Sequence, residues 1–77
     1  MKIKVLGTGC AKCHSLEKMV RNTVTELNID AVVEKEEDIM KIISYGVRMT
    51  PALVVDEKVV LAGHLPSEKE LKELLTK

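Results

Sequence analysis

The two cysteines of the chain, Cys10 and Cys13, lie in the segment GTGCAKCHSL, and His14 follows them directly. Three chemistries use a Cys-x-x-Cys pair followed by histidine: a dithiol that cycles to a disulfide, a clamp for a soft metal ion, and covalent attachment of haem. Cysteines at positions i and i+3 of a first helical turn lie on one side of the helix, within reach of a disulfide after small adjustments. The rest of the sequence must choose among these chemistries.

The composition limits the class of protein. The chain has 77 residues, so we expect one domain over residues 1–77, near the lower limit for folding by hydrophobic burial alone. Its 12 basic and 12 acidic residues balance, which removes the positive charge typical of proteins that bind nucleic acids or anionic membranes. Tyr45 is the single aromatic residue, so the core must be aliphatic. We expect a monomer with neither a nucleic-acid nor a membrane partner.

The expected location bears on the cysteines. No segment approaches the ~20 apolar residues that span a bilayer, and the N-terminal MKIKVLG is too short and too regularly alternating for a signal peptide. We therefore expect a cytoplasmic protein. Permanent structural disulfides are rare in a reducing cytosol, so reactivity or metal binding is the favoured reason for having the pair.

The first half of the chain predicts a strand, a helix and a second strand. Residues 2–6 alternate polar and apolar side chains and end at Gly7, which is typical of a strand entering a tight turn. The apolar residues that recur at helical spacing after Cys13 are Leu16, Val20, Val24 and Leu27. The β-branched segment 29–35 predicts a second strand, which would be parallel to the first because a helix connects them.

The second half predicts a helix, a hairpin and a final helix. Segment 36–46 places Ile39, Ile42 and Ile43 on one helical face and Gly46 at a left-handed cap. Segment 50–63 has two apolar runs around Asp56-Glu57-Lys58, which indicates an antiparallel hairpin. Segment 66–75 predicts a helix that begins with a capping box. The residues of that box are Ser67 and Glu70, and the buried stripe is Leu71, Leu74 and Leu75.

The order β-α-β-α-β-β-α predicts an α/β fold in which helices flank both faces of a four-stranded mixed sheet. Cys10 and Cys13 occupy the carboxyl end of its first strand, a typical reactive position in such sheets. The N-terminus of the following helix stabilises a thiolate, and Lys12 adds a positive charge. Cys10, at the exposed turn, is the expected nucleophile. Cys13, one turn further in, is expected to resolve the mixed disulfide that the nucleophile forms.

A family resemblance rests on three features: the order of elements, the Cys-x-x-Cys motif at the helix start, and MTPALVVDEKVVLAG, which places Thr50-Pro51 before a hairpin. Together they resemble the thioredoxin superfamily, in particular its small glutaredoxin-sized, thioredoxin-like members in archaea and bacteria, over essentially the whole chain. The resemblance implies a minimal thioredoxin-like fold and a thiol–disulfide oxidoreductase without a bound cofactor. Its implied partners are protein disulfides and a disulfide reductase.

The resemblance also assigns roles to residues. It implies that Cys10 attacks, that Cys13 resolves, that Pro51 is a cis-proline facing them, and that the backbone of Thr50 holds an incoming polypeptide. The best-known member of the family has tryptophan before the pair and Gly-Pro within it, whereas this chain has Gly9 and Ala11-Lys12. The motif therefore leaves the redox potential and the electron donor open.

Other readings of the cysteine pair stay open. A small Cu(I) carrier also places Cys-x-x-Cys after a first strand, although such domains run β-α-β-β-α-β and end in a strand. A zinc site needs four ligands, and only His14 and His64 remain to complete one, so we predict no metal site. Covalent haem would require export, for which the chain shows no signal. A binding module with a redox-sensing dithiol is the remaining alternative.

Overall fold

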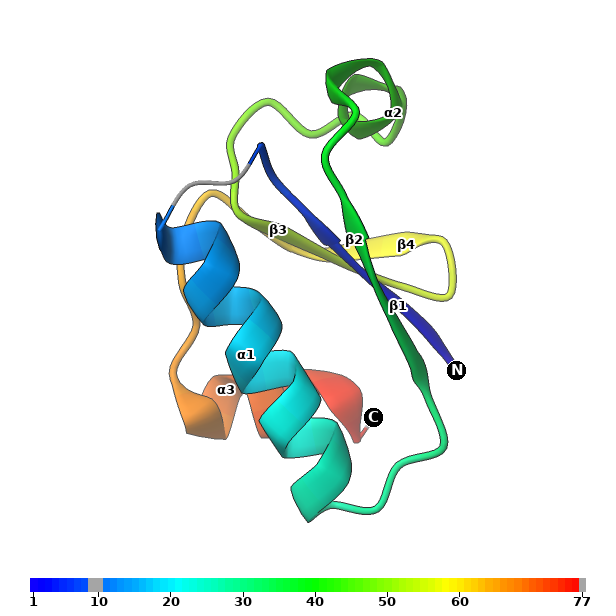
Figure 1. Ribbon diagram of the computed structural model, residues 1–77, viewed down its shortest axis with the longest axis vertical. Helices are drawn as coiled ribbons and strands as arrows, with labels where there is room; N and C mark the ends of the chain where they lie inside the picture. Colours follow the sequence, from blue (N-terminus) through cyan, green and yellow to red (C-terminus); the bar gives the residue numbers. More distant parts are fainter. Residues whose placement is uncertain (9–10, 77) are drawn as a thin grey trace.

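The computed structural model describes residues 1–8 and 11–76 and contains the predicted order of elements (Figure 1). These elements are β1 (Lys2–Leu6), α1 (Ala11–Glu26), β2 (Val32–Glu36), α2 (Ile39–Ser44), β3 (Ala52–Val55), β4 (Lys58–Ala62) and α3 (Glu68–Leu75). Within the described part of the chain, no helix is long and apolar enough to cross a membrane.

The four strands form one mixed sheet in the order β2-β1-β3-β4. β1 and β2 are parallel, with Ile3 opposite Val33, while β3 is antiparallel to both β1 and β4. A register shift between Leu53 and Val54 interrupts the β3–β4 pairing. The predicted parallel crossover through α1 and the predicted antiparallel hairpin are therefore both confirmed.

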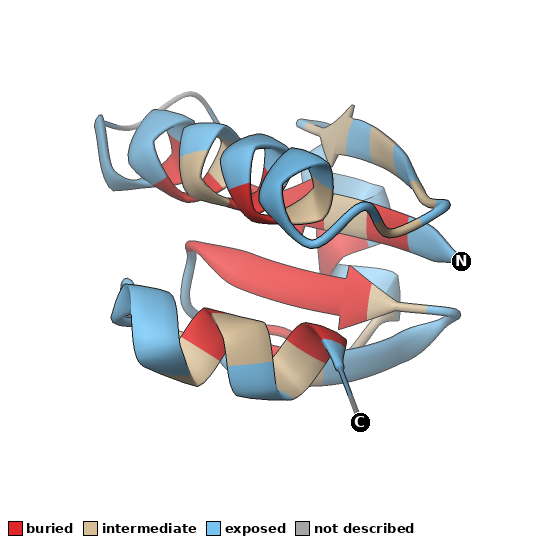
Figure 2. Cartoon of the chain, turned by 90° about the horizontal axis from the view of Figure 1, so that it is seen from below, coloured by how far each residue is buried: buried red, intermediate tan, exposed pale blue. Residues whose placement is uncertain are grey.

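One face of the sheet is covered by α1 and α3, and the main core lies between them and the strands. Figure 2 shows the buried residues of both helices turned toward the interior, with exposed residues on their outer sides. The buried residues of this cluster are Ile3, Val5, Leu16, Val20, Leu53, Leu61, Leu71 and Leu75. The periodic residues of the sequence thus meet the alternating residues of the strands in an aliphatic core.

α1 ends one residue earlier than its apolar stripe predicts. Asn28 adopts a left-handed conformation with φ 53°, and its N–H donates to Thr25 while the N–H of Ile29 donates to Val24 over 2.9 Å. These two bonds form a Schellman motif, which satisfies the last carbonyls of the helix. Leu27 therefore lies beyond the helix and is exposed, rather than extending the buried stripe.

The predicted capping box at α3 is present in part. Ser67 is the N-cap, and its hydroxyl accepts a hydrogen bond of 3.1 Å from the N–H of Glu70. The Glu70 carboxylate lies 3.6 Å from Nε2 of His64. α3 buries Leu71 and Leu75, whereas Leu74 is only partly buried.

The other face of the sheet is covered only at the end near α2. Its buried residues are Leu6, Ile42, Val47, Ala52 and Val54, and Tyr45 packs against them. α2 has six residues, shorter than the predicted segment, and Asp38 caps it by accepting from the N–H of Met40. Gly46 has φ 80°, as expected of a left-handed position after a helix.

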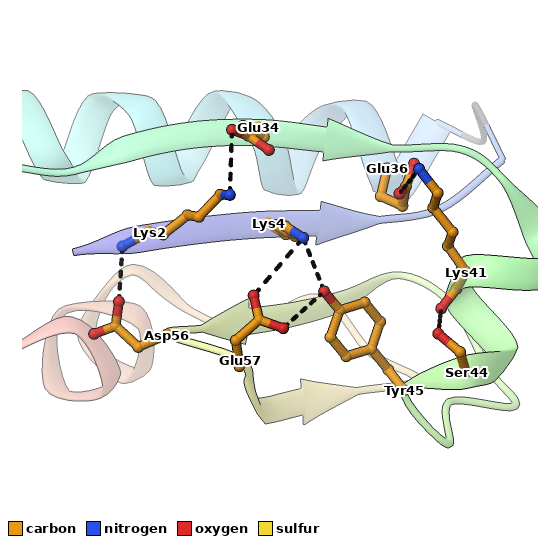
Figure 3. A network of polar contacts seen from close by, with 9 residues as sticks. All are labelled: Lys2, Lys4, Glu34, Glu36, Lys41, Ser44, Tyr45, Asp56 and Glu57. Carbon is orange, nitrogen blue, oxygen red and sulfur yellow. Dashed lines mark hydrogen bonds and ion pairs between the residues drawn. The ribbon is translucent and has the colours of Figure 1, made fainter.

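Charged side chains occupy the uncovered part of that face (Figure 3). Nζ of Lys4 donates to the Tyr45 hydroxyl over 2.9 Å and lies 3.8 Å from a carboxylate oxygen of Glu57. The hydrogen bond that Lys4 donates to Tyr45 is the main cause that raises the pKa of Lys4 above its ordinary value. Lys2 lies 4.0 Å from Glu34 on the same face.

A tight turn joins β3 to β4 and contacts the start of β1. Asp56 and Glu57 have φ 48° and 69°, the two positive values that a type I′ turn requires. The Asp56 carboxylate accepts from the N–H of Lys2 over 2.8 Å, and the Asp56 N–H donates to the Lys2 carbonyl. In Figure 1 the N-terminus lies at the end of β1 far from the first turn of α1.

Candidate functional site

The candidate site lies at the carboxyl end of β1, where the sequence places the cysteine motif. Gly7 is buried directly after β1, and its N–H donates to the Glu36 carbonyl over 3.0 Å. Thr8 follows and is exposed. The expected nucleophile, Cys10, lies outside the described residues, and α1 begins at Ala11.

Cys13 lies in the first turn of α1, is disulfide-bonded and is only 1% exposed. It shares the inward stripe of α1 with Leu16 and Val20, because residues three and seven positions apart lie on one helical face. Its neighbours Lys12 and His14 are both exposed. Cys13, which the sequence places one turn further in than Cys10, is therefore part of the buried side of α1.

The charge around the start of α1 favours an anion. The first turn of α1 carries no acidic residue, so no side chain of that turn offsets the positive end of the helix dipole. Lys12 adds a basic side chain in the same turn.

The Thr50–Pro51 segment lies beside the same site. Its peptide bond is cis, as the resemblance implies, and Pro51 is buried whereas Thr50 is exposed. The Pro51 carbonyl accepts a hydrogen bond of 2.9 Å from the N–H of Gly63, which ties this segment to the residues after β4. Among the described residues, no backbone hydrogen-bond partner is found for Thr50.

Gly7 brings the two parts of the site together. A Cβ atom built on Gly7 would lie 2.9 Å from Cβ of Cys13 and 4.0 Å from Cβ of Thr50. The buried cysteine and the residue before the cis-proline therefore flank the same glycine. The residue after β1, the first turn of α1 and the segment before β3 therefore meet here. The order of elements predicts this place for the cysteine motif, and the family resemblance implies the approach of the Thr50–Pro51 segment.

A groove of about 640 Å³ runs from the candidate site along α2. Thr8 and Thr50 form its end near the cysteine motif. Ile39 and Ile43 line it with exposed fractions of 59% and 57%, and Arg48 contributes a cation. The groove can therefore accept an extended segment with apolar side chains.

Sequence reasoning missed this groove. Three isoleucines were expected on one face of α2, but only Ile42 packs onto the sheet. The short helix covers only one end of the sheet, so Ile39 and Ile43, four residues apart, lie on a neighbouring row that faces the groove. The four-residue spacing of Ile39 and Ile43, which places two apolar side chains on one row of the helix, was the available signal.

The remaining candidate ligands are dispersed. His14 is exposed on α1, and His64 lies before α3 beside Glu70. Over residues 1–8 and 11–76, no group of three or more His, Cys, Asp and Glu residues is arranged to hold a metal ion. Met49, next to Thr50, is 66% exposed and lies against Gly63.

Comparisons with known proteins agree with this geometry. The thioredoxin domain family matches residues 1–76. A protein named thioredoxin from Methanothermobacter thermautotrophicus is 42% identical over 76 residues, covering 99% of both chains. Another named thioredoxin, from Methanocaldococcus jannaschii, is 40% identical over 95% of this chain and 84% of its own. A probable thioredoxin from Archaeoglobus fulgidus is 34% identical over 88% of this chain and 77% of its own. The family match over nearly the whole chain, together with these relatives, shows that the chain belongs to the thioredoxin domain family.

Proposed function

We propose that the protein is a thiol–disulfide oxidoreductase that exchanges a Cys10–Cys13 disulfide with disulfides of partner proteins. The observation that carries this proposal is the buried, disulfide-bonded Cys13 in the first turn of α1, beside the cis Thr50–Pro51 segment. Family membership supports the same type of chemistry. We further propose that the protein acts as a monomer in the cytoplasm and is reset by a disulfide reductase.

The reaction consists of two exchanges. The Cys10 thiolate attacks one sulfur of the partner disulfide, forms a mixed disulfide and releases the other sulfur as a thiolate, which takes up a proton. The Cys13 thiolate, formed by losing its proton, then attacks Cys10 and releases the second partner sulfur. The partner gains two electrons and two protons, and the Cys10–Cys13 pair becomes a disulfide. A dithiol of the reductase reverses these changes in the pair.

Burial supports the division of roles between the cysteines. Cys13 is almost inaccessible, so an external disulfide reaches it poorly, whereas an attack within the motif needs no access from solvent. The thiolate at the helix start is stabilised by the α1 dipole and by the basic side chain of Lys12. We therefore propose Cys10 as the nucleophile, Cys13 as the resolving thiol and Lys12 as the residue that tunes the nucleophile.

The substrate segment would bind along Thr50. The backbone of Thr50 has no hydrogen-bond partner among residues 1–8 and 11–76, so it can pair with an extended chain in the manner of an added strand. Pro51 is buried and tied to Gly63, so it holds Thr50 in place at the end of the groove. Apolar residues of the partner would contact the groove surface near Ile39 and Ile43.

The decisive experiment compares two single substitutions. Reduction of a protein disulfide, such as those of insulin, is measured with dithiothreitol as the electron donor. We expect Cys10→Ser to abolish exchange and Cys13→Ser to accumulate mixed disulfides that mass spectrometry detects. Equal loss in both variants without any mixed disulfide would contradict the assigned roles.

The same preparation separates the alternatives. Titration with Cu(I) in the presence of a competing chelator measures metal affinity, and tight binding with thiols that never exchange would replace this proposal with a metal carrier. A protein that exchanges slowly with every disulfide but changes shape on oxidation would instead be a redox sensor.

The role of Lys12 has a matched control on the same helix. Lys12 and Lys18 are both exposed on α1, but only Lys12 lies in the first turn. Lys12→Gln should move the pH dependence of Cys10 alkylation to higher pH, because a positive charge near the thiolate is removed. Lys18→Gln should leave this dependence unchanged, and equal shifts in both variants would exclude a specific role for Lys12.

A further inference from the structure

Gly7 is the residue closest to the buried sulfur of the motif. A Cβ atom at this position would overlap Sγ of Cys13 and would lie 2.9 Å from its Cβ. Real Cβ atoms essentially never approach other atoms closer than 3.0 Å. The backbone φ of Gly7 lies outside the left-handed region, so other residues could adopt this conformation. Glycine is required here by the space that the sulfur of Cys13 occupies.

Gly46 shows the opposite combination. Its φ is 80°, which is unfavourable for residues with a side chain, yet a Cβ there would meet nothing within 4 Å. Substitution of Gly46 therefore tests backbone strain without crowding. Substitution of Gly7 tests crowding against Cys13 without backbone strain, so the two positions form a matched pair.

The gap between Gly7 and Cys13 is fixed from both sides. The N–H of Gly7 donates to Glu36, which holds the end of β1 beside β2. On the other side, α1 is anchored by Leu16 and Val20, both of which are fully buried. Because a close-packed core resists displacement, neither backbone can retreat far from an added methyl group. The added atom must therefore act on the side chain of Cys13.

We propose that Gly7 is a positioning residue that favours the disulfide over the dithiol form of the Cys10–Cys13 pair, an inference that rests on the proposed function. In the disulfide, a covalent bond fixes the position of Sγ of Cys13, which is the position seen against Gly7. In the dithiol, that covalent bond is absent and no longer fixes χ1 of Cys13, so the side chain can adopt another rotamer to relieve the overlap. A side chain at position 7 therefore destabilises the disulfide more than the dithiol, and Gly7 makes the reduced protein a stronger electron donor.

The test measures the equilibrium between the pair and glutathione. Two glutathione thiols reduce the protein disulfide to a dithiol and form glutathione disulfide, a transfer of two electrons and two protons. We expect Gly7→Ala to shift this equilibrium about tenfold or more toward the dithiol, which corresponds to about 30 mV for a two-electron couple. Gly46→Ala should lower stability and leave the redox equilibrium unchanged. An unshifted Gly7→Ala, or a shift toward the disulfide, would overturn the inference.

A second measurement tests the inference if Gly7→Ala folds poorly. Denaturant unfolding is compared between Gly7→Ala and wild type, in both oxidised and reduced forms. The folding equilibrium constant should fall about tenfold more in the oxidised form, because the same thermodynamic cycle links folding to the redox equilibrium. Equal loss in the two forms would overturn the inference.

If Gly7→Ala unfolds in both redox states, the same substitution is made in the Cys13→Ala variant, and the folding of the double variant is measured. Removing the sulfur should restore folding of the double variant in part, although the 2.9 Å approach to Cβ of residue 13 persists. Failure to recover would overturn the inference.

Failure of this inference is distinguishable from failure of the proposed function. The glutathione equilibrium requires no protein substrate, so it can be measured even if the wild type reduces no protein disulfide. If the wild type reduces protein disulfides but Gly7→Ala has an unshifted glutathione equilibrium, only the inference about Gly7 is contradicted. If the wild type reduces no protein disulfide but Gly7→Ala shifts the glutathione equilibrium toward the dithiol, only the proposed function is contradicted.

Discussion

The two faces of the sheet differ in what covers them, and β1 contributes to both. Toward α1 and α3, β1 presents Ile3 and Val5, which are essentially fully buried. Toward the other side it presents Lys2, Lys4 and Leu6, of which only Leu6, at the α2 end, is buried. The face covered by α1 and α3 forms an aliphatic core, whereas the α2 face is half covered and carries ion pairs.

The candidate site lies at the carboxyl end of β1, where residues from both sides of the sheet come together. Cys13 belongs to the inward stripe of α1 and is buried with the main core. The groove with Ile39 and Ile43 belongs to the α2 side and is open. This division places Cys13, the proposed resolving thiol, on the closely packed side of the sheet and the proposed substrate contacts on the side that α2 only partly covers. Stability and recognition should therefore respond to different substitutions.

The largest effect is expected on the face covered by α1 and α3. Leu16 is fully buried between α1 and the sheet, so Leu16→Ala should lower the free energy of unfolding by about 2–5 kcal/mol through lost burial and a cavity. Denaturant unfolding at constant redox state measures this loss. A loss below about 1 kcal/mol would mean that this face is not the main source of stability.

Two adjacent isoleucines on α2 allow the contributions of buried and exposed side chains to be compared on the other face of the sheet. Ile42 is 4% exposed and Ile43 is 57% exposed. Ile42→Ala should cost about 2 kcal/mol, at the low end for a core isoleucine, because the core beneath α2 is small. Ile43→Ala should change stability by no more than about 0.5 kcal/mol but raise KM for a protein disulfide, because it removes groove surface. Equal stability losses would contradict the assigned orientation of α2.

The smallest effect concerns the charged part of the α2 face. Lys4 has a raised pKa, chiefly because of its hydrogen bond to Tyr45. A raised folded-state pKa means that the stabilisation by protonated Lys4 is complete below the unfolded value of about 10.4 and is lost as pH rises through the folded value. Tyr45→Phe should lower the Lys4 pKa measured by NMR and weaken the alkaline loss of stability. An unchanged Lys4 pKa in this variant would show that the hydrogen bond is not its cause.

The element order and the main core could be predicted because they follow local patterns. The alternation of residues 2–6 and the three- and four-residue spacing after Cys13 each indicate one element and its buried side. Ser67 marks the start of α3 because capping depends on residues only three positions apart. The place of the cysteine motif at the end of β1 follows from the order of these elements.

Features that depend on distant partners could not be predicted. Periodicity showed that α2 has an apolar face, but whether another element covers Ile39 and Ile43 depends on the whole fold. The contact of Lys4 with Tyr45 joins residues 41 positions apart, and nothing in either local segment indicates it. Gly7 was read as part of a turn, whereas its packing against Cys13 is visible only after α1 folds back onto β1.

The position of the N-terminus has a practical consequence. Met1 contacts the Asp30 carbonyl through its amino group and the Val32 N–H through its carbonyl, at the end of β1 opposite Gly7. A tether or affinity tag joined to Met1 would therefore start at the end of β1 opposite Gly7. A protein attached through Met1 to an electrode or resin would therefore keep the residues beside Cys13 away from the support, a suitable arrangement for voltammetry or for capturing mixed-disulfide partners.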